Sequence, residues 1–224
     1  MKVTTFTLEM LTAPVEPARG FPKDARLDRA TSVSPEYARF LYGLVGGPWS
    51  WTDRLEWSRQ QWLDELSIVG TEFWILYGGG VPLGYAHLCP SLAKGGTQVE
   101  IRYFGLTEQS IGRGLGGRLL EHGIRAAWSL SDRFAVPAVT RVWVHTCTLD
   151  GPAALANYQN RGLVICAVEE DEQFEPDLAL GSWVSTGGPE DKAEHPYTYV
   201  REPASHQHAG CGEYTGKGHD PVSL

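Results

Sequence analysis

Apolar residues recur at intervals of three and four along several stretches of the chain, which predicts amphipathic helices. The first stretch starts at Ser34, an N-cap residue followed by proline at the first helical position, and stops at Gly46 and Gly47. For the second stretch, Thr52 is the expected cap. The pattern predicts helices near residues 35–45, 52–66, 114–130 and 152–161.

Aromatic and β-branched residues fill several other segments, which favours strands. Residues 73–77 and 83–88 flank a run of three glycines and are expected to pair as a hairpin. The order of elements is helices first, then the hairpin, then strands that alternate with helices. This order predicts an α+β fold with a mostly antiparallel sheet. Further strands are expected near residues 98–104, 141–146 and 163–168.

In the strand near residues 98–104, apolar and polar side chains alternate, so its two faces are expected to differ. The more apolar face should pack in the core. The alternation places Val99, Ile101 and Tyr103 on that face and Glu100, Arg102 and Phe104 on the other.

The composition indicates one folded domain, because 224 residues with 42% apolar and 21% charged side chains suffice for one buried core. The chain has 27 acidic and 19 basic residues and a formal net charge of −8. Binding to a phosphate backbone needs a basic face, so nucleic acid is excluded as the main partner. A cationic or neutral substrate is expected instead.

No window approaches the roughly 20 consecutive apolar residues of a membrane span, and the first residues lack the features of a signal peptide. These features predict a cytoplasmic protein without a membrane partner. The widely spaced cysteines are expected to be free thiols, namely Cys89, Cys147, Cys166 and Cys211.

The composition changes in the last forty or so residues, where glycine, proline and histidine are frequent and apolar periodicity ends. We therefore expect a folded domain over residues 1–184 and a tail over residues 185–224. The tail should be irregular or disordered unless it packs on a partner. Three residues of this tail could bind a metal, namely His206, His208 and Cys211, but no fourth ligand is spaced convincingly, so no metal site is predicted.

The segment Ile111-Gly112-Arg113-Gly114-Leu115-Gly116-Gly117 lies between a predicted strand and the longest predicted helix. Glycines let backbone N–H groups approach an anion, and the N-terminus of the following helix favours negative charge. The segment predicts a phosphate-binding loop with Arg113 as a charged ligand. The alternative is that its glycines are needed only because the backbone adopts positive φ angles there. A P-loop is excluded because the required Lys and Ser/Thr are missing. A dinucleotide-binding GxGxxG loop with Asp132 stays as an alternative.

A second motif follows, in which Ala154, Tyr158 and Gly162 stand at four-residue intervals. With this run and the glycine segment, residues 72–168 resemble the Gcn5-related N-acetyltransferase (GNAT) family, whose motifs are Q/R-x-x-G-x-G/A and N-x-x-A-x-x-x-Y-x-x-x-G-F. The resemblance implies a GNAT-like mixed, mostly antiparallel twisted sheet flanked by helices. The sequence departs from the motifs at Ile111, Gly151 and Leu163.

The resemblance also implies acetyl-coenzyme A as the acyl donor. In this family the diphosphate lies on the glycine loop and the pantetheine arm lies along the preceding strand. Gly105 is expected to interrupt the pairing of that strand and to turn one amide toward the thioester. The coenzyme-binding residues implied are Phe104, Gly105 and Leu106 in the strand and Gly112, Arg113, Gly114, Leu115, Gly116 and Gly117 in the loop.

The same resemblance implies that the Tyr158 hydroxyl protonates the departing thiolate, as general acid. Packing of the short helix on the sheet is the alternative role of this tyrosine. Glu100 is the expected catalytic base, which needs a pKa raised by partial burial. An ion pair with Arg102 is the alternative role of Glu100, and His145 is the second candidate base.

The predicted function is transfer of an acetyl group from acetyl-CoA to a primary amine, in a small molecule or a peptide, by direct attack in a ternary complex. Trp49, Trp51 and Asp53 lie in the loop that would cover the acceptor, where they bind its ammonium group or cap the core. A covalent route through Cys147 beside His145 stays open. A non-catalytic acyl-CoA sensor, a dinucleotide-binding oxidoreductase and formation of a homodimer stay open as well.

Overall fold

The computed structural model describes residues 2–172 and 180–188, and it confirms the predicted α+β fold. The strands are β1 (Lys2–Met10), β2 (Ala25–Ala30), β3 (Glu72–Gly78), β4 (Val81–Ala93), β5 (Gly96–Leu106), β6 (Val139–Cys147) and β7 (Val164–Glu172). The α-helices are α1 (Pro35–Gly46), α2 (Arg59–Leu66), α3 (Leu115–Trp128), α4 (Ala154–Gln159) and α5 (Gly181–Ser185). Short 3-10 helices are η1 (Gly47–Trp49), η2 (Glu108–Ser110) and η3 (Leu130–Asp132).

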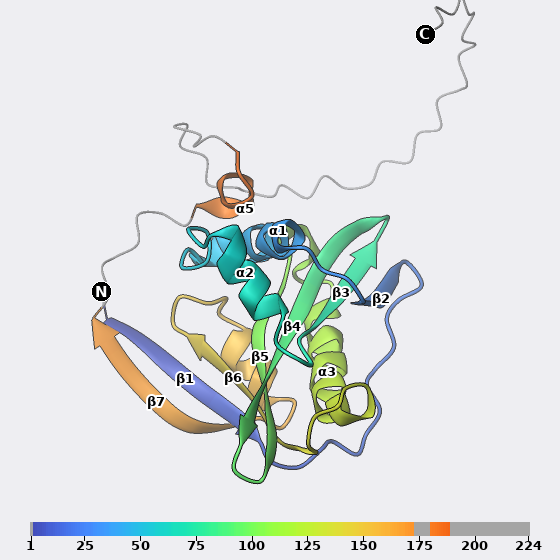
Figure 1. Ribbon diagram of the computed structural model, residues 1–224. Coiled ribbons are helices and arrows are strands. Elements are labelled where there is room, and N and C mark those ends of the chain that lie inside the picture. Colours follow the sequence, from blue (N-terminus) through green and yellow to red (C-terminus); the bar gives the residue numbers. More distant parts are fainter. Residues whose placement is uncertain (1, 173–179, 189–224) are drawn as a thin grey trace, which may run out of the picture. The chain divides into compact units, whose positions relative to one another are not determined.

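All seven strands form one sheet in the order β2-β3-β4-β5-β6-β1-β7 (Figure 1). Every neighbouring pair is antiparallel except β5 and β6, which run parallel. The N-terminal strand β1 lies between β6 and β7, so the first residues of the chain pair with strands more than 130 positions later in the sequence.

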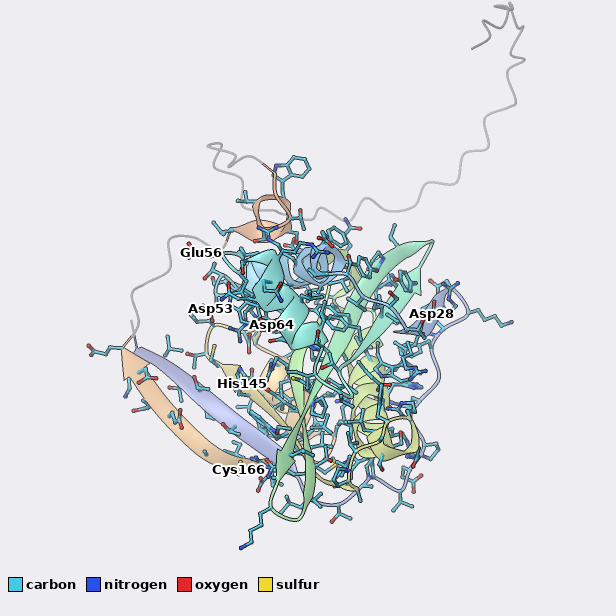
Figure 2. All side chains as sticks on the ribbon, viewed as in Figure 1. Asp28, Asp53, Glu56, Asp64, His145 and Cys166 are labelled. Carbon is cyan, nitrogen blue, oxygen red and sulfur yellow. The ribbon has the colours of Figure 1, made fainter. Side chains whose placement is uncertain are left out.

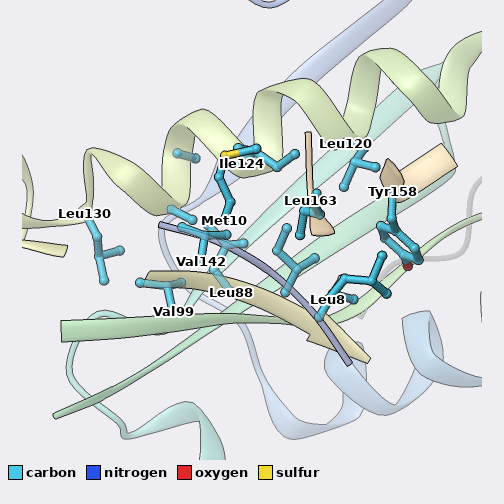
Figure 3. Close-up of a cluster of buried hydrophobic side chains, with 14 residues drawn as sticks. Leu8, Met10, Leu88, Val99, Leu120, Ile124, Leu130, Val142, Tyr158 and Leu163 are labelled. Carbon is cyan, nitrogen blue, oxygen red and sulfur yellow. The ribbon is translucent and has the colours of Figure 1, made fainter. Parts of the chain in front are cut away.

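Helices cover both faces of the sheet. On one face α1 and α2 lie together and bury a cluster that includes Leu41, Trp62 and Tyr85. On the other face α3 and α4 pack on the central strands. Figure 3 shows this second cluster, with Leu130 at one end and Tyr158 at the other.

The helix starts follow local capping chemistry. The Ser34 hydroxyl accepts a hydrogen bond from the amide of Tyr37, and proline follows at the first position of α1, as predicted. The start expected for α2 at Thr52 is wrong, because α2 begins after Ser58. There the Ser58 hydroxyl accepts from the amide of Gln61 while the Gln61 side chain accepts from the amide of Ser58, and this capping box satisfies two helix-end donors at once.

The strands β1 and β2 and the short helix α5 were not predicted. Strand β1 contains four threonine or phenylalanine residues in a row, a β-favouring composition, and it contributes Val3, Leu8 and Met10 to the core. Strand β2 forms the opposite edge of the sheet and pairs with β3 alone.

The structure also bears on the predictions about membrane spans and cysteines. No helix among residues 2–172 and 180–188 is long and apolar enough to cross a membrane. Within the same residues Cys89, Cys147 and Cys166 are free thiols, as expected. Residues 189–224, with His206, His208 and Cys211, lie outside the described part of the chain.

Candidate active site

The parallel ladder between β5 and β6 ends at the pair formed by Glu100 and Trp143. Beyond this pair β5 continues to Leu106, hydrogen-bonded only to β4, and β6 continues to Cys147, hydrogen-bonded only to β1. The facing edges of the two strands therefore have no strand partner in the described part of the chain. Such edges offer backbone donors and acceptors to an extended ligand.

A β-bulge interrupts β5 at Arg102. Leu88 of β4 lies opposite Ile101 and His87 lies opposite Tyr103, so Arg102 is the extra residue. The bulge shifts the alternation by one position, and this corrects the predicted faces: Tyr103 joins the cluster beneath α1 and α2, whereas Phe104 packs toward α3.

The break expected at Gly105 is therefore wrong, because Gly105 is paired with Tyr85 and the interruption lies three residues earlier. A Cβ atom at Gly105 would contact Val45 of α1, so glycine here permits close packing of α1 on the sheet. Its neighbour Leu106 contacts the start of α3 near Gly116.

The glycine loop leads into α3 with its amides exposed. Gly112 and Gly114 have φ angles of 80° and 70°, and the space where a Cβ would stand is open at both positions. Gly114 is the N-cap of α3 and supplies no side-chain cap. Within residues 2–172 and 180–188, none of the amides from Gly112 to Gly117 donates a hydrogen bond to the protein. These amides and the helix N-terminus together suit an anion.

Two side chains near this loop have roles that the sequence did not indicate. The Arg161 guanidinium fills the space where a Cβ of Gly117 would stand, and its Nε donates to the Gly117 carbonyl at 2.9 Å. Gly117 is therefore required for close packing. Arg113, the expected phosphate ligand, forms an ion pair with Asp24 at 2.9 Å.

A cavity of about 370 Å³ lies beside α3, next to Arg161. The linker between β1 and β2 forms its other wall, where Arg19 holds Glu121 of α3 through hydrogen bonds of 3.0 and 3.1 Å. Arg125 donates to carbonyls of the same linker. With three arginines against two glutamates in its wall, the cavity suits an anionic ligand.

Tyr158 lies on α4 beside the gap between β5 and β6. It is 5% exposed, and its ring packs edge-on against Phe104 with 5.9 Å between ring centroids. Burial, and to a smaller degree the charge of Asp150, raises the pKa of the phenol well above its ordinary value. The phenol therefore stays protonated, and its raised pKa makes it a weaker acid than an ordinary tyrosine.

Glu100 and His145 meet where the ladder ends, with 3.3 Å between Oε1 of Glu100 and Nδ1 of His145. Nη2 of Arg102 lies 2.7 Å from the other oxygen, so the ion pair considered from the sequence is confirmed. Burial raises the pKa of Glu100, but the hydrogen bonds and charges of His145 and Arg102 outweigh it and lower the pKa overall. The raised pKa expected for Glu100 is thus wrong. The hydrogen bond that His145 donates to Glu100 raises the pKa of His145, whose side chain is 52% exposed.

Aromatic side chains line the face beneath α1 and α2. Trp51 packs against Tyr42 and Tyr103 with ring centroids 5.6 Å apart in each pair, and its Nε1 donates to Asp150 at 3.3 Å. Trp49 packs on Gly151. Trp51 thus caps the core, which was one of the two roles considered for these tryptophans, whereas Trp49 covers the chain at Gly151.

Exposed carboxylates lie around α2. Figure 2 shows Asp53, Glu56 and Asp64 near this helix, and His145 below it. Asp53 is close enough to Cys147 and Tyr42 for its charge to raise the pKa of both. The exposed surface around α2 therefore carries several carboxylates.

The sequence did not indicate Glu65 and His87 as parts of this region. Glu65 of α2 is buried and forms an ion pair with Arg102 at 3.0 Å, and His87 of β4 is fully buried beside it. A glutamate three residues after Trp62, on the apolar stripe of a helix, was the available signal.

Comparison with protein families gives one match. The model of the acetyltransferase (GNAT) family matches residues 36–163, from the start of α1 to the residue before β7. The match includes the glycine loop, Tyr158 and the gap between β5 and β6, and it leaves β1 and β2 outside. Among curated proteins, none matches the sequence.

Solved structures share the fold at low sequence identity. A GCN5-related N-acetyltransferase from Sphaerobacter thermophilus has a TM-score of 0.51 and 14% identity, over 75% of this chain and 51% of that one. A tandem GNAT protein from the clavulanic acid biosynthesis pathway has a TM-score of 0.52 and 14% identity, over 78% and 55%. A Drosophila protein has a TM-score of 0.51 and 14% identity, over 76% and 50%. This chain spans about half the length of these proteins.

Proposed function

Because the chain belongs to the acetyltransferase (GNAT) family, we propose that it moves an acetyl group from acetyl-coenzyme A to a primary amine by direct attack in a ternary complex. One observation carries the proposal: the unpaired edge of β5 ends at Leu106, close to the free amides from Gly112 to Gly117. An extended thioester with a diphosphate at one end requires both features together.

Different residues bind different parts of acetyl-coenzyme A. The backbone of Phe104, Gly105 and Leu106 binds the amides of the pantetheine arm, and the amides from Gly112 to Gly117 hold the diphosphate. The cavity beside α3 gives room for the nucleotide end, within reach of Arg161. The thioester then lies between Tyr158 and the pair formed by Glu100 and His145.

The proton transfers follow from the protonation states. The amine nitrogen attacks the thioester carbon while His145 accepts the proton that the amine loses, and Glu100 stabilises the resulting imidazolium. Glu100 acts through His145 because its own lowered pKa makes it a weak base. The carbon–sulfur bond breaks, and Tyr158 donates its proton to the sulfur. The products are an amide and a free thiol, and solvent returns the proton from His145 to Tyr158.

The acceptor is expected to be a cationic amine. Asp53, Glu56 and Asp64 are exposed around α2, and the whole chain has a formal net charge of −8. Such a field raises the local concentration of cations around α2. The bound ammonium releases one proton to solvent before the attack, so His145 is free to accept the second proton when the carbon–nitrogen bond forms.

A screen of primary amines tests the proposal. The full chain is mixed with acetyl-CoA and each amine, and release of free thiol is followed together with the mass of the N-acetylated product. Release with at least one class of cationic amine is expected. Tight binding of coenzyme A without release for any amine would overturn the proposal in favour of a non-catalytic acyl-CoA sensor.

A further inference from the structure

Glu65 on α2 is a buried carboxylate that the proposed chemistry does not use. Its side chain is 6% exposed, and its Oε2 lies 3.0 Å from Nη1 of Arg102. Its Oε1 has no hydrogen-bond partner among the described residues and lies 3.6 Å from Nδ1 of His87. Burial lowers the pKa of His87 to about 3, so His87 is neutral. Arg102 is thus the cation that compensates Glu65.

Arg102 connects Glu65 to the reaction centre. It is the extra residue of the bulge in β5, and one end of its guanidinium binds Glu65 while the other binds Glu100 at 2.7 Å. Glu100 in turn lies 3.3 Å from His145. Four charged or titratable groups therefore form a continuous chain from α2 through β5 to β6.

We propose that Glu65 is a positioning residue that controls how tightly Arg102 holds Glu100, and thereby how strongly Glu100 acts on His145. This inference rests on the proposed function, in which His145 accepts the proton. One guanidinium carries one positive charge, so when it is shared by two carboxylates it neutralises the negative charge of each only in part. When the charge of Glu65 is removed, the positive charge of Arg102 is neutralised by Glu100 alone. The net negative charge near His145 is then smaller.

The sign of the effect follows from the groups that face His145. Glu100 and Asp150 favour its protonated form, and Arg102 opposes it. Loss of the Glu65 charge strengthens the net positive effect of Arg102, so the pKa of His145 should fall. The base then becomes deprotonated at a lower pH.

The test uses Glu65→Gln, which keeps the shape of the side chain and a hydrogen-bond acceptor for Arg102. The NMR titration of the His145 ring is measured in the coenzyme-free full chain, and the pH dependence of kcat/KM is measured beside it. We expect both to shift to lower pH by about half a unit or more. The matched control is Glu36→Gln, the same substitution at an exposed carboxylate at the start of α1, which pairs with Arg59 and should leave both unchanged.

An unchanged His145 titration in Glu65→Gln would overturn the inference, and so would an equal shift in Glu36→Gln. If Glu65→Gln does not fold, Glu65→Asp withdraws the carboxylate by one methylene group. It should then shift the titration in the same direction by less, and no shift would again overturn the inference. The NMR titration needs no turnover. A failed amine screen would therefore reject the proposed function without testing the effect of Glu65 on His145.

Discussion

Oε1 of Glu100 lies 3.3 Å from Nδ1 of His145, at the point where the ladder between β5 and β6 ends. One edge of the imidazole is held by a buried carboxylate, while about half of the side chain is exposed. A carboxylate in this position fixes the orientation of the ring and stabilises its protonated form. A buried carboxylate on β5 thus orients an accessible proton acceptor on β6.

Glu100→Gln should move the acid limb of the kcat/KM profile to lower pH. The base must be unprotonated to act, and the hydrogen bond that His145 donates to Glu100 is the largest cause of the raised pKa of His145. In the unmodified chain the limb should lie above the ordinary histidine value of about 6.5. His145→Gln should remove this limb and reduce kcat/KM by about 10²-fold or more. An acid limb unchanged in Glu100→Gln would contradict the pairing.

Tyr158→Phe should reduce kcat by about 10²-fold, with little change in the affinity for the coenzyme. The phenylalanine keeps the edge-on contact with Phe104, and the removed hydroxyl has no partner among the described residues, so folding should be preserved. Steady-state kinetics and a thermal melt measure the two effects. An undiminished rate would leave Tyr158 with a packing role alone.

Gly114→Ala should weaken coenzyme A binding more than a comparable glycine substitution elsewhere. Gly79→Ala is the matched control, because Gly79 also has a positive φ angle and open space around it but lies in the turn between β3 and β4. Each substitution carries about 1 kcal/mol of backbone strain, whereas only Gly114 caps α3. Coenzyme A should raise the melting temperature of Gly79→Ala and have little effect on Gly114→Ala. Equal rises in both variants would argue against the loop as the diphosphate site.

Cys147→Ala should leave turnover nearly unchanged. Burial is the largest cause that raises the pKa of this thiol, so it stays protonated and is a poor nucleophile. Initial rates measure the effect, and the mass of the unmodified chain after incubation with acetyl-CoA alone gives a second readout. An acetyl adduct that disappears in Cys147→Ala would show a covalent route in place of direct transfer.

The features that were predictable from the sequence depend on neighbouring residues. The cap at Ser34, the apolar stripe of α3 and the left-handed Gly162, with a φ of 85°, each need only a few adjacent positions to form. The run of threonines in β1 is a local signal of the same kind, although the strand was not predicted from it.

The features that were not predictable depend on contacts between distant residues. The bulge at Arg102 exists only in the register of β5 with β4, and its effect was to invert the expected positions of Tyr103 and Phe104. The ion pair of Arg102 with Glu65 joins residues 37 positions apart. Single-strand alternation contains no information about either contact, and so the lowered pKa of Glu100 was also missed.

Calorimetric titration of the full chain with coenzyme A, with NAD⁺ as the competing dinucleotide, tests the central claim most directly. The free amides from Gly112 to Gly117 and the unpaired edge of β5 predict saturable binding of coenzyme A at one site and no binding of NAD⁺. Saturable binding of NAD⁺ without binding of coenzyme A would contradict the account.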